Sequence, residues 1–339
     1  APPCSLWMRA ARRLVRIAAS TASSALQPLH AKRLSTMAAA SDSSCKVALC
    51  QMTVVEDKAT NIAHAREMVK RAVDSGAALV VLPEVFNGPY DTTKFASFAE
   101  PVPEVGGAVD EAASPTLAML AATAKEHGVF LVGGSVAELG QPASEGAAPA
   151  VFNTCTVWSP AGELIAKHRK MHLFDIDVPG RITFKESDSL TAGSGLAAFD
   201  TPFGRVGVGI CYDLRFPQLS ALLRHKEDCS VLVFPGAFNT TTGPAHWELL
   251  LRARALDNQV FVCACSPARN PDAGYQAYGH STVVDPWGAV VATTEHDEAI
   301  VLADMNVPRA AEVRTNIPIS KQVRTDLYTD VEWKGPGRA

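Results

Sequence analysis

Short apolar runs alternate with amphipathic stretches between residues 46 and 134. Lys46–Met52 predicts a strand, and apolar residues at helical spacing then continue to Gly76, where a helix is expected to end. Ala77–Leu82 is a continuous apolar run, which is typical of a strand buried on both faces. Ser114 and Pro115 are suited to begin a second helix, which ends near Gly128.

The same pattern continues toward the C-terminus. Apolar and alternating runs predict further strands at residues 129–134, 152–158, 163–168, 204–210, 230–234, 259–265, 278–284, 289–294 and 299–303. Helices are expected after Cys211 to about His225 and over residues 243–258. Strands and helices joined by short connections predict a layered α/β fold, in which the two strand-rich halves can form two packed sheets.

Three segments fall outside this pattern. Residues 137–150 are small, polar and turn-rich, and are interpreted as a surface loop insertion. The stretch from Arg169 to about Gly195 is expected to be largely irregular. Residues 331–339 form a C-terminal tail, which leaves one folded domain over residues 42–330.

Residues 1–41 contain no Asp or Glu and carry Arg9, Arg12, Arg13, Arg16, Lys32 and Arg33 among Ala, Ser and Leu. This composition is typical of an organelle transit peptide, and a mitochondrial location is expected, with the plastid or the cytoplasm as alternatives. A cloning or gene-model artefact, with Met37 as another start, is the competing interpretation.

Composition narrows the function classes. The 339 residues carry a net charge of −4 and are 47% hydrophobic, and no basic stripe beyond residue 41 suggests a nucleic-acid partner. No window reaches the roughly 18 apolar residues that a membrane helix needs. The eight cysteines lack Cys-x-x-Cys spacing and nearby His pairs, so reduced thiols are expected in place of disulfides or a metal site.

Chemically useful residues follow three of the predicted strands: Glu84, Lys170 and Cys211. Ligand sites in α/β folds gather at the carboxyl ends of strands. Alone, each residue has a plain interpretation as a solvated charge or an inert buried thiol. Together they supply a nucleophile, a base and a cation that can stabilise an oxyanion. This combination is typical of a thiol-dependent amide hydrolase.

Three motifs carry a family resemblance. Leu82-Pro83-Glu84, the segment 169–173 and the segment 209–216 resemble the signatures of the nitrilase, or carbon–nitrogen hydrolase, superfamily, and the match runs from about residue 46 to 328. The resemblance implies a four-layer α-β-β-α sandwich of two mixed sheets, with subunits that pair as a homodimer. It implies no cofactor and no metal.

The resemblance also assigns roles. Glu84 would be the general base and acid, Lys170 the cation that stabilises the oxyanion, and Cys211 the nucleophile that forms a thioester. Glu186 would position substrate and water, and the N–H group of Tyr212 would complete the oxyanion site.

Segments 174–184, 235–247 and 257–261 resemble the ω-amidase branch, whose members hydrolyse the terminal amides of 2-oxoglutaramate and 2-oxosuccinamate to 2-oxo diacids and ammonia. This branch implies metabolic coupling to glutamine transaminases. Alternatives are a deaminated glutathione amidase, another amidase or a nitrilase, a catalytically silent scaffold, and a redox-sensing thiol protein.

A small anionic substrate needs a matching pocket. The guanidinium of Arg215 suits a carboxylate, unless it pairs structurally with Asp213 or Glu248. By resemblance, Phe238 would form an apolar wall and Thr242 would donate a hydroxyl, while Tyr90 would lie on the rim. His246 and His280 are assigned structural roles.

Overall fold

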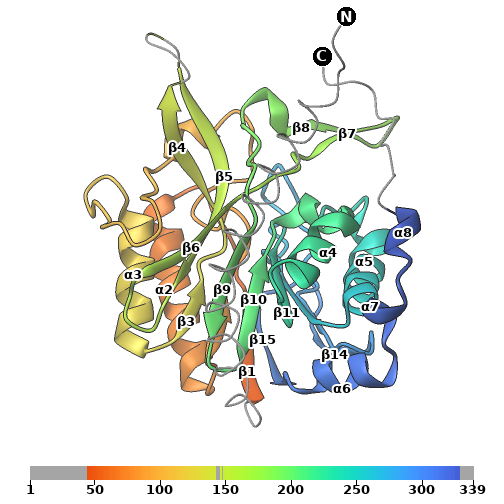
Figure 1. Ribbon diagram of the computed structural model, residues 1–339. Helices are drawn as coiled ribbons and strands as arrows, with labels where there is room; N and C mark the ends of the chain where they lie inside the picture. Colours follow the sequence, from red (N-terminus) through yellow and green to blue (C-terminus); the bar gives the residue numbers. More distant parts are fainter. Residues whose placement is uncertain (1–43, 143–145, 147, 329–339) are drawn as a thin grey trace, which may run out of the picture. The chain divides into compact units, whose positions relative to one another are not determined.

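Two mixed β-sheets lie face to face at the centre of the protein (Figure 1). The computed structural model describes residues 44–142, 146 and 148–328. The expected transit peptide and the tail at 331–339 lie outside the described residues. Within those ranges no helix is both long and apolar enough to cross a membrane.

The first sheet has seven strands in the order β15-β1-β2-β3-β5-β4, with β6 paired to β5. Strands β1, β2 and β3 run parallel, and the other pairings are antiparallel. The bounds are Ser44–Gln51 for β1, Leu79–Val81 for β2, Phe130–Val132 for β3, Val136–Pro142 for β4, Pro149–Trp158 for β5, Leu164–Arg169 for β6 and Ala299–Asn306 for β15.

The second sheet has six strands in the order β14-β13-β12-β11-β10-β9. Strands β10, β11 and β12 form its parallel centre. The bounds are Ala197–Thr201 for β9, Gly204–Val208 for β10, Val231–Pro235 for β11, Phe261–Cys265 for β12, Thr282–Val284 for β13 and Val290–Thr293 for β14.

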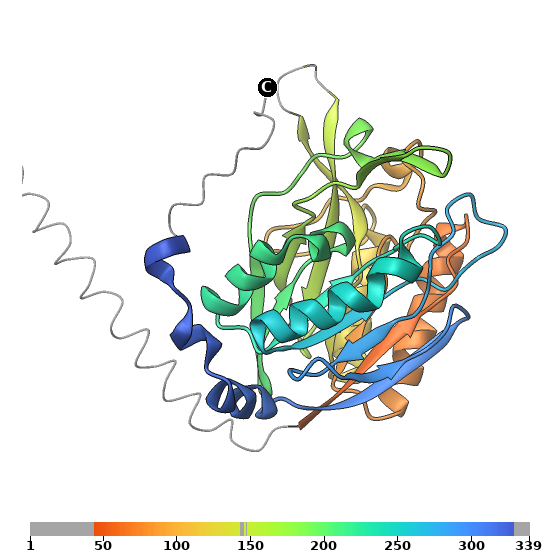
Figure 2. The ribbon, with the colours of Figure 1, turned by 90° about the vertical axis from the view of Figure 1, so that its right-hand side faces the viewer.

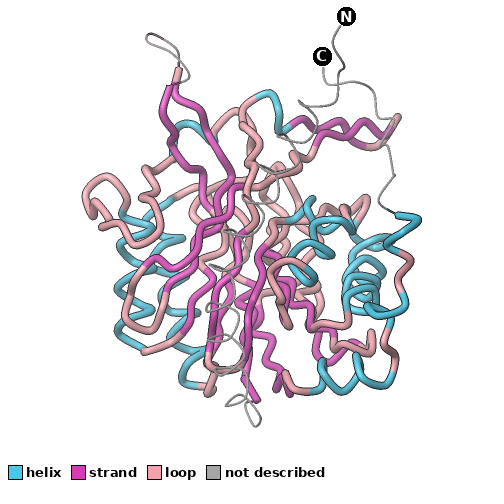
Figure 3. Tube along the Cα trace, viewed as in Figure 1, coloured by secondary structure: helices cyan, strands magenta, loops and turns pink. Residues whose placement is uncertain are grey.

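Helices cover the outer face of each sheet, as the cyan segments on both sides of the magenta strands show (Figure 3). Helices α2 (Lys58–Asp74) and α3 (Pro115–His127) pack on the first sheet. Helices α4 (Pro217–His225) and α5 (Gly243–Asn258) cover the second sheet and lie in front of it in Figure 2. The expected four-layer α-β-β-α sandwich is confirmed.

The alternation of side chains along the strands explains the layers. Val47 and Leu49 of β1 point into the core between the sheets, whereas Ala48 and Cys50 point toward α2 and α3. Because successive side chains of a strand point to opposite faces, an uninterrupted apolar strand serves two cores at once. This is why the central strands read as continuous apolar runs.

The helix ends follow the expected signals. Asp57 caps α2 by accepting a hydrogen bond from the N–H of Thr60, and Pro115 occupies the first turn of α3. Gly128 ends α3 with a φ of 62°, a left-handed conformation in which a side chain would be strained. Three short helices, α6 (Arg309–Asn316), α7 (Ile319–Gln322) and α8 (Thr325–Tyr328), follow β15.

The interpretation of residues 137–150 as a loop is corrected by the structure. Residues 137–142 belong to β4, which pairs with β5 to form a hairpin, and 149–150 begin β5. Glu138 is buried in this hairpin because Thr154 and Arg169 donate hydrogen bonds to its carboxylate. The polar composition of this segment therefore predicted a loop, although its buried polar groups form hydrogen bonds within a strand pair.

The stretch after Arg169 is also more ordered than expected. It holds a separate two-stranded sheet of β7 (Asp175–Val178) and β8 (Ile182–Lys185), followed by the short 3₁₀ helix η2 (Glu186–Asp188). Both strands alternate polar and apolar residues, but each is only four residues long and lies in a stretch that otherwise lacks periodicity.

Candidate active site

Four predicted residues meet at one end of the sandwich. Glu84 follows β2, Lys170 follows β6, Glu186 begins η2, and Cys211 follows β10 at the start of η3 (Cys211–Arg215). Glu84, Lys170 and Glu186 are each at most 1% exposed, and Cys211 is 4% exposed. Charged side chains buried so completely must bind one another, and these do.

Lys170 lies between the two glutamates. Its Nζ donates to Glu84 Oε1 at 2.9 Å and lies 2.9 and 2.8 Å from Oε1 and Oε2 of Glu186. Nζ also lies 3.3 Å from the hydroxyl oxygen of Tyr90. One buried ammonium group therefore pairs with two buried carboxylates.

Glu84 is held from two other directions. Asn153 Nδ2 donates to its Oε1 at 2.9 Å, and the backbone N–H of Ala237 donates to its Oε2 at 2.8 Å. The thiol of Cys211 lies close enough to this carboxylate for the two groups to shift each other's pKa. Glu84 is therefore oriented toward the thiol, as a base must be to accept its proton.

Glu186 is anchored to the β7–β8 segment and to Tyr90. The N–H of Phe174 donates to Oε2 at 2.6 Å, and the Tyr90 hydroxyl donates to Oε1 at 2.5 Å. Tyr90 was expected on the pocket rim, but its hydroxyl belongs to the buried cluster itself.

The backbone of Cys211 is strained. Its φ is +46°, a left-handed value that non-glycine residues seldom adopt and that is often found at functional sites. Gly236 leaves room for this bend, since a Cβ there would lie 3.1 Å from the Cα of Cys211. The sharp turn directs the thiol toward Glu84, at the point where β10 gives way to η3.

The electrostatics of the cluster depend on burial and on an excess of acid. Burial raises the pKa of Glu84, and the charge of Glu186 raises it further, against the lowering effect of Lys170. Burial and then the charge of Glu84 raise the pKa of the Cys211 thiol. Burial alone would lower the pKa of Lys170, but Glu186 and Glu84 outweigh it and raise that pKa, so the lysine stays charged.

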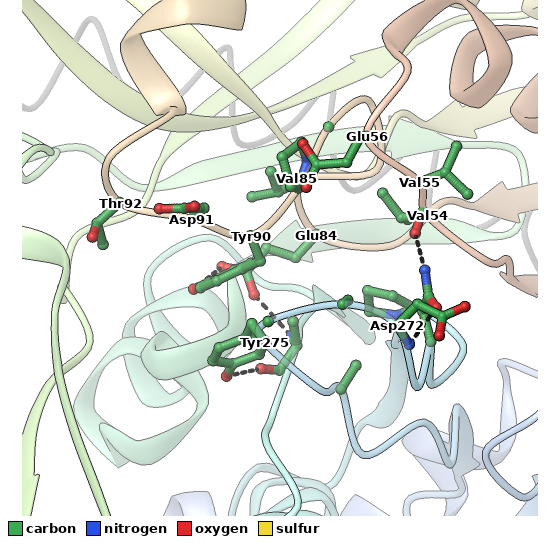
Figure 4. A pocket seen from close by; sticks show the side chains of 18 of the residues that line it. Val54, Val55, Glu56, Glu84, Val85, Tyr90, Asp91, Thr92, Asp272 and Tyr275 are labelled. Atoms are coloured by element: carbon green, nitrogen blue, oxygen red, sulfur yellow. Dashed lines mark hydrogen bonds between the residues drawn. The ribbon is translucent and has the colours of Figure 1, made fainter.

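A cavity of about 580 Å³ reaches this cluster from the surface. Tyr90 and Tyr275 lie side by side on its wall with Glu84 next to them (Figure 4), their ring centroids 4.5 Å apart. The hydroxyl of Tyr275 donates to the carbonyl of Ala237 at 2.6 Å, next to the N–H group that holds Glu84. The volume suits a small molecule.

The expected substrate-binding residues are only partly brought together. The guanidinium carbon of Arg215 lies 4.7 Å from the centroid of the Phe238 ring, and Nη1 donates to His246 Nδ1 at 3.1 Å. The alternative in which Arg215 pairs with Asp213 or Glu248 is wrong: Asp213 binds two histidines, and Glu248 lies near Arg252.

Thr242 lies immediately before α5, where its N–H and hydroxyl both donate to Asn239 Oδ1. None of its hydrogen bonds within the described residues reaches the cluster. His280 donates through Nδ1 to the carbonyl of Tyr278, in keeping with a structural role.

Sequence reasoning missed Asn153 and Tyr275. Asn153 interrupts a mostly buried strand, and a polar residue at such a position is a signal that could have been read. Tyr275 lies in a loop without a local pattern, and only the folded chain brings it to Ala237.

The chemistry of this arrangement is that of a thiol hydrolase. It joins a thiol, a carboxylate in contact with it, and a buried ammonium group, which together can open an acyl bond and stabilise an oxyanion. Among the described residues no group of three His, Cys, Asp or Glu side chains could hold a metal ion.

Comparison with known proteins agrees with this chemistry. The model of the carbon–nitrogen hydrolase family matches residues 46–315, and the chain belongs to that family. It is 48% identical over 294 residues to "Omega-amidase NIT2" of Mus musculus, covering 87% of this chain and 100% of that protein. It is also 48% identical to "Omega-amidase, chloroplastic" of Arabidopsis thaliana, covering 84% of this chain and 74% of that protein.

The fold is likewise shared with solved structures. Nit3 of Saccharomyces cerevisiae, a member of branch 10 of the nitrilase superfamily, superposes with a TM-score of 0.73 at 40% sequence identity. The match covers 83% of this chain and 97% of Nit3. The family resemblance inferred from the motifs is confirmed.

Proposed function

We propose that this protein is an ω-amidase that hydrolyses the terminal amide of a small 2-oxo acid, such as 2-oxoglutaramate or 2-oxosuccinamate, to the diacid and ammonia. The observation that carries this proposal is the buried cluster of Glu84, Lys170, Glu186 and Cys211. Its support is the 48% identity to ω-amidases along most of the chain.

In the proposed mechanism, Glu84 takes the thiol proton and the Cys211 sulfur attacks the amide carbon. Lys170 Nζ and the N–H of Tyr212 stabilise the oxyanion, and protonated Glu84 gives its proton to the departing nitrogen, which leaves as ammonia. A thioester remains. Glu84 then takes a proton from water, whose oxygen attacks the thioester; collapse releases the carboxylic acid, and the proton returns from Glu84 to the sulfur.

The raised pKa of Glu84 favours this proton transfer, whereas the raised pKa of the Cys211 thiol, caused by burial and then by the charge of Glu84, opposes it. A thiolate next to a charged Glu84 is unfavourable, but the transfer removes the charge of Glu84 as it creates that of the sulfur. The thiolate then faces neutral Glu84 and the cation of Lys170, so the net charge of the buried site does not change. The two groups behave as one proton-sharing pair.

For the substrate, we assign its carboxylate to Arg215, with Phe238 beneath the guanidinium as an apolar wall. Burial lowers the pKa of Arg215, and its buried Nε has no hydrogen-bond partner within the described residues. An unpaired guanidinium nitrogen is a donor available to an anionic ligand. Thr242 and Tyr90 are the further substrate contacts proposed.

The test is ammonia release by the purified protein from 2-oxoglutaramate, with deaminated glutathione and a simple nitrile offered in parallel. The expected result is preference for 2-oxoglutaramate and loss of turnover in the Cys211→Ala variant. Preference for deaminated glutathione or the nitrile would move the protein to another branch of the family. No turnover of any of the three would contradict the proposed activity.

We also propose that residues 1–41 direct the protein to an organelle and that residues 42–330 form its catalytic domain. The acid-free composition supports targeting, to the mitochondrion or, as the name of the Arabidopsis relative suggests for that protein, to the plastid. Exposed apolar side chains such as Leu249 and Leu256 on α5 support pairing into a homodimer. Coupling to glutamine transaminases belongs to the same proposal.

A further inference from the structure

Asp213, a buried carboxylate outside the catalytic cluster, contacts the strand end that supplies Lys170. Residues 168, 170 and 172 alternate along the chain; the middle residue reaches the glutamates, and the outer two bind Asp213. His168 Nε2 lies 2.9 Å from Asp213 Oδ2, and His172 Nδ1 lies 2.7 Å from Oδ1. The N–H of His172 also donates to Oδ1, at 3.0 Å.

The same carboxylate fixes the turn that carries the nucleophile. The N–H of Ile210 donates to Asp213 Oδ2 at 3.0 Å, and the N–H of Asp213 donates to the carbonyl of Ile210 at 2.9 Å. These bonds enclose Cys211, whose backbone is in the strained left-handed conformation. One side chain therefore ties the lysine strand to the cysteine turn.

Asp213 is held as an anion in a dry environment. Asp213 and His168 side chains are 0% exposed. Burial alone would raise the pKa of Asp213, but the hydrogen bonds from His168 and His172 outweigh it, and the pKa lies well below its usual range. His172 is fixed further by Phe216, whose ring stacks on the imidazole at 3.6 Å between centroids and 9° between planes.

The imidazole of His168 fits one protonation state. Its Nδ1 is buried and has no hydrogen-bond partner within the described residues, which suits a nitrogen without a proton. The ring proton then lies on Nε2 and is donated to Asp213. Such an arrangement orients the strand end on both sides of Lys170.

We propose that Asp213 is a positioning residue that sets the placement of Lys170 Nζ relative to the Cys211 sulfur. This inference rests on the roles of Lys170 and Cys211 in the proposed function. Asp213 acts through its two histidines and through the backbone of Ile210, and it does not touch the substrate. Its loss is therefore expected to slow bond making at Cys211 more than substrate binding.

The test compares Asp213→Asn with Glu100→Gln. Both replace a buried carboxylate by its amide, but Glu100 binds Lys58 and Thr116, outside the cluster. In Asp213→Asn one carboxylate oxygen becomes an NH₂ group that must face a donor. We expect kcat to fall roughly 30-fold or more with KM within about threefold, and the rate of Cys211 alkylation by iodoacetamide to fall roughly 10-fold. Glu100→Gln is expected to leave the kcat and alkylation rate of the folded protein within about twofold.

A second comparison separates positioning from stability. His172→Gln is expected to lower kcat several-fold, and adding it to Asp213→Asn is expected to slow the enzyme little further, because both act through one contact. His172→Gln also tests the inference if Asp213→Asn does not fold. Folded Asp213→Asn with unchanged kcat and alkylation rate, or an unfolded Asp213→Asn beside a fully active His172→Gln, would overturn the inference.

The alkylation readout distinguishes the two proposals. If the wild-type protein hydrolyses none of the amides but Asp213→Asn still slows alkylation of Cys211, the proposed function fails and the positioning of Cys211 stands. If the wild-type protein is active and neither variant changes kcat or alkylation, the inference about Asp213 fails alone.

Discussion

The two faces of strand β6 carry charge in different ways. On the outward face, Arg169 donates to both oxygens of Glu138 at 2.8 and 2.6 Å, and Lys167 binds Glu104 at 2.7 Å. Two cations meet two carboxylates there, and Lys167 also approaches Glu138 at 3.6 Å. The Lys167 contact lowers the pKa of Glu104, so the carboxylate stays charged.

On the inward side, immediately after the end of β6, the single ammonium group of Lys170 meets both Glu84 and Glu186. The pKa of Glu84 is raised there, opposite to that of Glu104. Balanced ion pairs fix each group in one charge state, whereas an excess of buried acid leaves a proton that can be shared. Ion pairs are present on both sides of this strand. The reactivity expected at Lys170 therefore comes from the imbalance of charge and from burial away from water.

The largest difference is expected between Glu84→Gln and Glu138→Gln. The first removes the proposed base for the thiol proton, and kcat is expected to fall by about 10³ to 10⁴. The second breaks the balanced cluster and is expected to lower the free energy of unfolding by about 2 kcal/mol, with kcat within about threefold. Steady-state rates and urea unfolding of both variants provide the check. A Glu138→Gln protein as inactive as Glu84→Gln would remove the distinction between the faces.

Glu186→Gln removes the excess charge but leaves the base in place. We expect kcat to fall about 100-fold, because in the proposed mechanism Glu186 orients Lys170 and the water. The charge of Glu186 raises the pKa of Glu84, so its removal should lower that pKa. Glu84 would then lose its proton at lower pH, and the acid limb of the kcat/KM profile should shift to lower pH. A shift in the opposite direction would contradict this account of the charge excess.

Arg215 is a cation next to the same cluster, and no carboxylate among the described residues forms an ion pair with it. In Arg215→Lys the planar fork of donors is replaced by a point charge. We expect KM for 2-oxoglutaramate to rise about 10-fold, with little change in the KM of an uncharged primary amide. An equal effect on both substrates would show that Arg215 does not bind the substrate carboxylate.

The smallest effect is expected for Tyr90→Phe. The change removes the hydroxyl that donates to Glu186 but keeps the ring that stacks on Tyr275. Loss of one hydrogen bond to a buried carboxylate should lower kcat about threefold to 10-fold. Stopped assays of ammonia release measure this decrease in kcat, and circular dichroism verifies that the variant is folded. An unchanged kcat would place the hydroxyl outside the reacting cluster.

The strand ends that carry Glu84, Lys170 and Cys211 could be predicted from the sequence because their signals are local. Glu84 and Cys211 each follow a buried apolar run, and Lys170 follows a short strand, and these strand ends of the two sheets meet at one end of the sandwich. Glu186 lay in a stretch without periodicity and was assigned only through family resemblance. Strand β4 was missed because its polar side chains find partners only in the folded chain, and β7 and β8 were missed because each is only four residues long.

Long-range contacts set the other limit. The Tyr275 hydroxyl meets Ala237 from 38 residues away, and Asn153 reaches Glu84 across 69 residues. Closeness in sequence suggests Asp213 as a partner for Arg215. In the structure, however, Asp213 is bound by His168 and His172, which lie 45 and 41 residues away. Local pattern carries no information about such pairings.

The pairing of β1 with β15 has a consequence for biosynthesis. The first described strand and the last join over eight residues, from Ser44 with Asn306 to Gln51 with Ala299. A ribosome must therefore translate almost the whole chain before the first sheet gains its final strand, since non-local strand pairing waits for its partner. A chain that stops after α5 leaves β1 as an open edge, where another nascent chain can add.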